Sequence, residues 1–271
     1  LHLLSRRQRQ MCIRDRIKHH YTLFLNIAVS ISAACLTYAV CLYMAELLLH
    51  VSAVHEAGYI CSMLFIIPGF PFITSGIDLA KLDLRSGLER LTYSIIIVLV
   101  ATMFAWIMAL LLKLQPQDFV ALHLGSMMHL VLRLIASFCG VFGFSIMFNS
   151  SVYIAATAAC IGAVANTLRL ELVDYTGMPS AAAAFIGALT AGLLASIIKR
   201  NHGYPRISLT VPSIVIMVPG LYLYRAIYNF GIMSLTEAVL WFAAAIMIIV
   251  SLPLGLIFAR ILTDRTFRYC S

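Results

Sequence analysis

A Pro-Gly pair occurs twice in this chain, each time inside an apolar segment of membrane-crossing length: Pro68-Gly69 and Pro219-Gly220. Proline removes a backbone donor and clashes with the preceding turn, and glycine has little preference for a helix. Because the bilayer core holds no water to satisfy the freed backbone groups, a helix broken there must be buried in protein or line a polar cavity. Matching breaks in two halves of one chain indicate the binding site of a transporter.

The composition indicates a membrane protein. Of the 271 residues, 62% are hydrophobic and 11% are charged, whereas soluble domains average about 25% charged residues. We predict an all-α integral membrane protein with about eight transmembrane helices, each near the ~20 residues that span a bilayer. The predicted spans lie at about 22–49, 54–75, 91–114, 126–148, 151–169, 179–199, 208–228 and 234–260.

Lysine and arginine residues gather in alternate loops, which is the positive-inside pattern of membrane proteins. The side that holds the N-terminus also holds the basic residues of the stretches 81–90, 199–206 and 260–268. Both termini are therefore predicted to lie in the cytoplasm. This distribution accounts for the formal charge of +8 without a nucleic-acid partner.

The two Pro-Gly pairs also suggest an internal repeat. A shift of 151 positions places the first pair on the second and sets Asp78 against Asn229. With eight spans the two copies run in opposite directions, as in many secondary transporters. Residues 115–271 supply five spans and residues 21–114 only three, so we predict the remnant of a 5+5 inverted repeat whose truncated first half lacks two spans.

The first 20 residues form a basic N-terminal segment that differs from the rest of the chain. Its composition changes abruptly at Ile17, and the string QMCIRDR within it resembles translated sequencing-adapter read-through. We therefore interpret residues 1–16 as non-native. A genuine basic arm that binds anionic lipid is the competing interpretation.

A few charged residues within or beside the apolar segments are candidates for chemistry, because such groups usually face a partner or a cavity. Asp78 follows the first break and is predicted to bind a proton or a substrate amino group; a helix cap at the cytoplasmic edge is the alternative. Arg133 and Arg225 are the cations predicted to be available to an anionic substrate. Arg169 is interpreted as a helix-end residue that reaches the interface.

A helix interrupted at Pro-Gly exposes free carbonyls on one side and free amides on the other. Those groups can bind an ammonium and a carboxylate, which are the two charges of an amino acid. Enzymatic signatures are missing, since the sequence has no phosphate-binding loop and no nucleophile motif. The histidines lack the spacing of a tight metal motif. We therefore predict no enzyme, no metal and no cofactor.

The run IIPGFPFITSGIDLAKLDLRSGLERL at 66–91 resembles the signature around the first Pro-Gly pair of the threonine/serine exporter family. In that family the pair is followed by Gly-Ile-x-Asp-Leu and then Gly-x-x-Arg-Leu; here the stretch at 76–79 lacks the spacer residue. The second half is similar to the family's C-terminal module, with Tyr204-Pro205 and Val211-Pro212-Ser213 before the second pair. The resemblance covers about residues 22–262.

This resemblance implies a multi-pass protein of the plasma (inner) membrane that exports small amino acids such as threonine and serine by proton antiport. The motif positions that it carries over are Pro68, Gly69, Asp78, Pro219 and Gly220. A related two-subunit branch is linked to succinate export. The alternatives are therefore a dicarboxylate exporter subunit that uses Arg133 or Arg225, or a non-transporting partner subunit in a homo- or hetero-oligomer.

Overall fold

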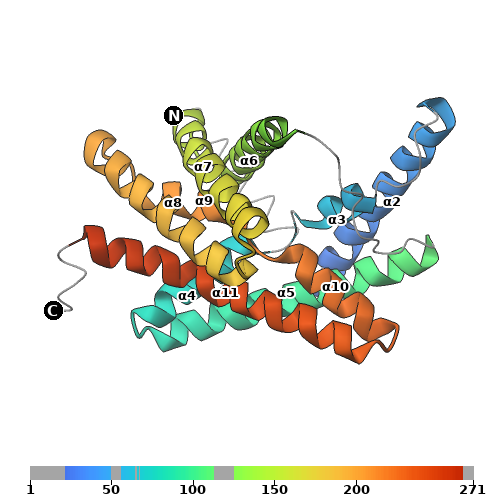
Figure 1. Ribbon diagram of the computed structural model, residues 1–271. Coiled ribbons are helices and arrows are strands. Elements are labelled where there is room, and N and C mark those ends of the chain that lie inside the picture. The colour runs from blue at the N-terminus through green and yellow to red at the C-terminus, as the bar shows by residue number, and fades with distance from the viewer. Residues whose placement is uncertain (1–21, 50–55, 65, 67, 113–124, 265–271) are drawn as a thin grey trace, which may run out of the picture. The chain divides into compact units, whose positions relative to one another are not determined.

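The computed structural model describes residues 22–49, 56–64, 66, 68–112 and 125–264, and these residues form helices and the turns between them (Figure 1). The predicted basic segment at 1–20 lies outside the described residues. No strand occurs in the described part of the chain. The prediction of an all-α membrane protein is confirmed.

The helices follow the predicted apolar segments closely. In chain order they are α2 (Leu23–Leu49), α3 (Glu56–Leu64), α4 (Gly69–Ala80), α5 (Leu84–Leu111), α6 (Ser126–Met147), α7 (Val152–Thr176), α8 (Ser180–His202), α9 (Arg206–Val215), α10 (Gly220–Gly231) and α11 (Leu235–Thr263). Among the described residues, six helices are long and apolar enough to cross a membrane, and the bent pair α9 and α10 makes up to seven.

The predicted count of eight is therefore higher than the six or seven that the helices give. The difference lies at the predicted span 54–75, which holds the short helices α3 and α4 of 9 and 12 residues. Each is shorter than the ~20 residues that a single span needs. A proline at position 68 immediately precedes α4, and a proline there prevents a continuous helix.

Two helix boundaries also differ from prediction. α5 begins at Leu84 instead of 91, because the Asp83 carboxylate accepts a hydrogen bond from the Ser86 N–H at 3.4 Å and caps the helix. α7 continues beyond 169 to Thr176 and ends at Gly177, whose φ of 64° is left-handed. In both places the polar residues that suggested a loop belong to the end of a helix.

The helices pack as two compact units, which we describe separately. Of the described residues, one unit holds those from 22 to 66 and from 96 to 112, and the other holds 68–95 and 125–264. This division does not follow the predicted repeats, because α4 and the start of α5 pack with the larger unit. α5 therefore contributes its first part to the larger unit and the rest to the smaller one.

In the smaller unit, Tyr59 of α3 is the central side chain. Only 2% of its surface is exposed. Its hydroxyl donates a hydrogen bond of 2.6 Å to the carbonyl oxygen of Ala105 on α5, and its ring makes an edge contact with Tyr38 of α2. A buried tyrosine needs such a partner for its hydroxyl, so this contact fixes α3 against α5.

In the larger unit, α9 lies at the centre and packs against α4, α6, α7 and α8. All its residues from Leu209 to Val215 are buried. In Figure 1 α6 and α7 run side by side. α8 and α11 approach closely because small residues meet: a Cβ added at Gly255 would lie 2.5 Å from the Phe185 carbonyl oxygen.

Candidate functional site

Both Pro-Gly pairs begin a helix after a break. Pro68 precedes α4 with φ −78° and ψ 67°, and Pro219 precedes α10 with φ −80° and ψ 55°. These angles are those of an inverse γ-turn, and the Gly220 N–H closes the second turn by donating to the Val218 carbonyl at 2.8 Å. The two prolines therefore give the backbone the same local shape.

The likeness continues along both helices. α4 and α10 each have 12 residues, and their bounds differ by the 151 positions of the predicted repeat. The carbonyls of Asp78 and Asn229 each accept a hydrogen bond from the residue five positions later, at 3.1 and 2.9 Å. Leu82 and Met233 then adopt the same left-handed backbone, each with φ 62°. The two segments match position by position.

The two breaks also lie next to each other within the larger unit. A Cβ added to the buried Gly69 would lie 3.1 Å from Val215 Cγ1 and 3.3 Å from Val218 Cγ2. Val215 ends α9, and Val218 is in the turn that leads to α10. The start of α4 therefore packs directly on the interrupted region between α9 and α10, and a side chain at position 69 would fit only if these valines moved by a few tenths of an ångström.

Asp78 is held at the turn between α4 and α5. Its Oδ2 accepts a hydrogen bond from Arg90 Nη1 at 2.7 Å and a longer one from the Ser86 hydroxyl at 3.5 Å. The Asp78 side chain is 19% exposed, whereas that of Arg90 is 51% exposed. The carboxylate therefore lies in a partly enclosed ion pair that links two helices.

Arg133 of α6 is neutralised by two carboxylates of α7. Its Nη1 lies 2.9 Å from Glu171 Oε1, and its Nη2 bonds to Asp174 Oδ2. The Arg133 side chain is only 17% exposed. The sequence predicted that Arg133 could bind an anionic substrate, but carboxylates of the protein already balance its charge.

Arg225 of α10 lies over an aromatic ring. Its guanidinium carbon is 4.7 Å from the ring centroid of Trp241 on α11, a distance typical of a cation–π contact. The Trp241 ring also makes an edge contact with Tyr222 at 5.4 Å. The Tyr222 hydroxyl is 3.1 Å from the hydroxyl of Ser180 on α8. These contacts fix α10 between α8 and α11, beyond the second break.

Arg169 of α7 has surroundings that sequence reasoning did not predict. Its Nε has no accessible surface and no hydrogen-bond partner. Its Nη1 reaches Asn166 Oδ1 only at 3.5 Å, and Asn166 is itself fixed by a 2.9 Å bond to the Ser137 hydroxyl. In the part of the chain that the structure describes, Arg169 forms no ion pair with a carboxylate.

The surroundings of Arg169 include the second break. A Cβ added at Gly187 of α8 would lie 3.2 Å from Arg169 Cβ and 3.3 Å from Met217 Sδ. Met217 belongs to the turn between α9 and α10. Sequence reasoning assigned Arg169 to the interface because the predicted helix ended at 169. The extra two turns of α7 set it inside the span.

Comparison with known families gives two matches that together cover most of the chain. The family model described as "Threonine/Serine exporter, ThrE" matches residues 133–262, and a second threonine/serine exporter model matches residues 11–113. The chain belongs to the threonine/serine exporter family. Its membership confirms the resemblance predicted from the two Pro-Gly signatures. The match at 11–113 contains the first Pro-Gly pair, and the match at 133–262 contains the second.

Searches of curated proteins and of solved structures found no match to this exporter-family chain.

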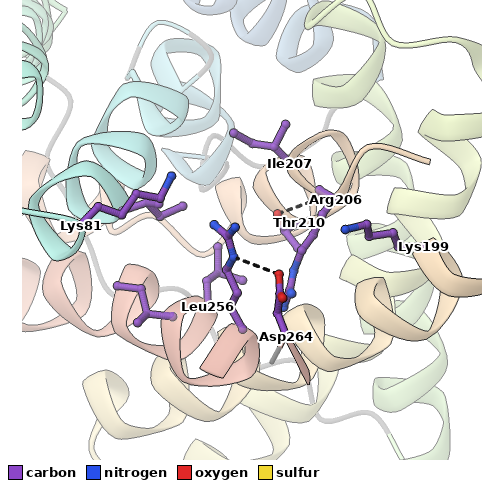
Figure 2. Close-up of a pocket in the computed structure, with 10 residues that line it drawn as sticks. Lys81, Lys199, Arg206, Ile207, Thr210, Leu256 and Asp264 are labelled. Carbon is purple, nitrogen blue, oxygen red and sulfur yellow. Dashed lines mark hydrogen bonds and ion pairs between the residues drawn. The ribbon is translucent and has the colours of Figure 1, made fainter. Parts of the chain in front are cut away.

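One further feature of this exporter-family chain is a basic pocket in the larger unit (Figure 2). It is a partly open pocket of about 250 Å³ and lies where α4, α8, α9 and α11 come together. Its charged lining residues are Lys81, Lys199, Arg206, Arg260 and Asp264. α4 ends at this pocket and α9 begins there, so both helices lead from the pocket to the two breaks.

Proposed function

We propose that this protein is a secondary active exporter of small amino acids, such as threonine and serine, that works by alternating access at the two Pro-Gly breaks. Family membership supports transport as the general activity. The observation that carries the proposed location is the packing of buried Gly69 against the interrupted segment from Val215 to Val218. Two broken helices in contact provide unpaired backbone groups that a substrate can bind.

The second break suits a carboxylate. The first N–H groups of α10 have no partner within the helix, and the N-terminus of a helix attracts negative charge. Arg169 lies beside the same turn without a carboxylate partner in the described residues. We propose that Arg169 binds the substrate carboxylate, because burial of an uncompensated cation in a membrane span costs several kcal/mol and an anionic ligand offsets that cost.

Proton coupling is proposed to occur at Asp78. The carboxylate forms an ion pair with Arg90 of α5 at 2.7 Å, so binding of a proton would neutralise the carboxylate and release the contact between α4 and α5. Because α4 starts at the first break, a change in this contact reaches the proposed substrate site through a single short helix of about 18 Å.

The proposal is tested with the full chain in proteoliposomes loaded with labelled threonine, serine or succinate. With a proton gradient imposed, efflux of threonine or serine is expected to exceed that from equally loaded liposomes without the protein. Dissipation of the gradient should remove the excess. An absence of efflux for all three compounds would overturn the transport function and favour the partner-subunit alternative.

The role of Arg169 is tested separately with a substrate whose carboxylate is replaced by an amide. Wild-type protein is expected to prefer threonine over threonine amide, and R169Q is expected to lose this preference. The R85Q variant is the matched control, because Arg85 is 92% exposed and pairs only with the exposed Glu89 in the described residues. If R169Q transported threonine with unchanged preference, Arg169 would have no part in carboxylate binding.

The second candidate function is export of a dicarboxylate. The basic pocket favours it, because the cations that line the pocket attract anions more strongly than zwitterions. In this alternative the sequence assigned the anion to Arg133 or Arg225, yet Arg133 already has two carboxylate partners. Efflux of succinate but not of threonine in the same liposomes would establish the dicarboxylate function.

A further inference from the structure

The basic pocket has an unusual charge balance for a membrane protein. Four cationic residues and one carboxylate line it. The carboxylate, Asp264, lies 3.7 Å from Arg260 Nε. The lining therefore carries an excess of three positive charges, contributed from the ends of four helices. Like charges gathered in a partly enclosed space repel each other, and a bound anion would relieve that repulsion.

The cations are arranged around one space. Figure 2 shows Lys81 on one side, with Arg206 and Lys199 on the other and Asp264 near them. Arg206 is anchored by protein groups: its Nη1 donates to Thr263 at 3.1 Å, and its Nη2 donates to the Gly192 carbonyl at 3.3 Å. Both acceptors are neutral. Arg206 is thus held rigidly at the pocket while its charge is not compensated by these two contacts.

The remaining lining residues are mostly apolar: Ile77, Ile207, Leu256 and Ile257, together with Thr210. A site that combines cations with aliphatic side chains at the ends of membrane helices matches the chemistry of the bilayer interface. There, phosphate groups adjoin the acyl chains. The aliphatic part of this lining can contact the acyl chains of a lipid, whereas a dicarboxylate would use mainly the cations.

The predicted topology places the pocket on the cytoplasmic side, since its cations belong to the basic stretches at 81–90, 199–206 and 260–268. The cytoplasmic leaflet carries the anionic lipids, and basic pockets between helices on that side bind their headgroups. We propose that this pocket binds the phosphate group of an anionic phospholipid. The bound lipid would tie together the ends of α4, α8, α9 and α11.

The experiment titrates short-chain phosphatidylglycerol into the purified full chain in neutral detergent, with binding followed by native mass spectrometry. Short-chain phosphatidylcholine serves as the uncharged comparison. Wild-type protein is expected to bind phosphatidylglycerol in preference. Removal of one interfacial cation should weaken binding about fivefold, so K81Q and K199Q should each show this loss, and the double variant a loss of about 30-fold.

The R85Q variant again provides the matched control, because it removes one cation from the stretch at 81–90 without altering the pocket lining. It is expected to bind the lipid as wild type does. Equal loss in R85Q and K81Q would overturn the proposal, since it would show a diffuse surface charge. Unchanged binding in the double variant would also overturn it.

Two soluble competitors identify the source of the anion. Inorganic phosphate is expected to displace the lipid only at far higher concentration, because it lacks the apolar part. Displacement by phosphate or by succinate at concentrations similar to that of the lipid would overturn the lipid assignment. Effective competition by succinate would assign the pocket to a dicarboxylate. None of these readouts depends on transport, so they stand apart from the test of the exporter function.

Discussion

The α4–α5 and α10–α11 segments have the same backbone but different side-chain contacts between their helices. In the first, Asp78 of α4 pairs with Arg90 of α5 at 2.7 Å. At the equivalent positions 151 residues later, the second has Asn229 and Trp241. Asn229 donates to the Arg225 carbonyl within its own helix at 2.9 Å, and Trp241 contacts α10 through aromatic and cation–π interactions.

This difference distinguishes the residues that define the backbone of a broken helix from the contacts that can change with protonation. The Pro-Gly pair and the left-handed residue after the helix occur in both copies, and they are sufficient to define the backbone. The contact between the helices is ionic in one copy and aromatic in the other. Only the ionic contact can change with protonation, so the first copy is the one in which we propose proton coupling.

The largest effect is expected from Asp78→Asn, which gives the first copy the residue type of the second. Gradient-driven efflux should be abolished, because the amide cannot take up or release a proton, while the amount of protein in the membrane stays normal. Efflux from proteoliposomes measures this. E89Q is the control, since that carboxylate lies on the neighbouring helix α5 and is 69% exposed. Unchanged efflux in Asp78→Asn would remove Asp78 from the mechanism.

The next effect concerns the packing of α4, which has no counterpart in α10. A Cβ at Gly76 would lie 2.3 Å from Cγ of Pro253, whereas the second copy has Ile227 at the equivalent position. G76A should lower the free energy of unfolding by about 1–3 kcal/mol, measured by denaturation in detergent. G143A is the control, because nothing lies within 4 Å of that position, and it should cost nothing. Equal stability of both variants would contradict the close packing.

The equivalence of the two turns is tested at their left-handed residues. Leu82 and Met233 are 81% and 82% exposed, so their side chains contribute little packing. A non-glycine residue in this left-handed conformation costs about 1–2 kcal/mol of stability. Glycine removes that cost, but it also loses more conformational entropy on folding, which offsets part of the gain. L82G and M233G should each raise the thermal midpoint slightly, by a similar amount. A gain at one site and a loss at the other would break the equivalence.

The smallest effects are expected from the contacts between the helices. R90Q should lower stability by about 0.5 kcal/mol or less, since Arg90 is half exposed and solvent screens the pair. R225Q should cost about 1 kcal/mol through the lost contact with Trp241. Thermal unfolding of the two variants side by side tests the order. A larger loss in R90Q would show that the ionic contact is the stronger of the two.

The sequence predicted most of this fold because its signals are local. Apolar runs mark the long helices, and proline followed by glycine marks the start of α4 and α10. The family likewise follows from the short signature after Pro68-Gly69. The membrane topology and the inverted repeat stay predictions, although the matched bounds of α4 and α10 agree with the 151-residue shift.

The site was less accessible to sequence reasoning because it depends on partners that lie far apart in the chain. Nothing in the sequence near Arg133 indicates that it forms ion pairs with Glu171 and Asp174, some 40 positions later. Arg169 was misplaced by a few residues at a helix end, and this error changed its interpretation from interface to interior. The basic pocket combines residues from four helices, and a loop-by-loop count of charge cannot show that they meet.

The two-carboxylate contact of Arg133 also bears on which parts of the molecule can move. It joins α6 to α7 at a point where sliding of one helix along the other would separate Arg133 from the carboxylates of Glu171 and Asp174. These two helices are thus expected to shift as one rigid body. In a conformational cycle the short helices α4, α9 and α10 would then be displaced relative to α6 and α7.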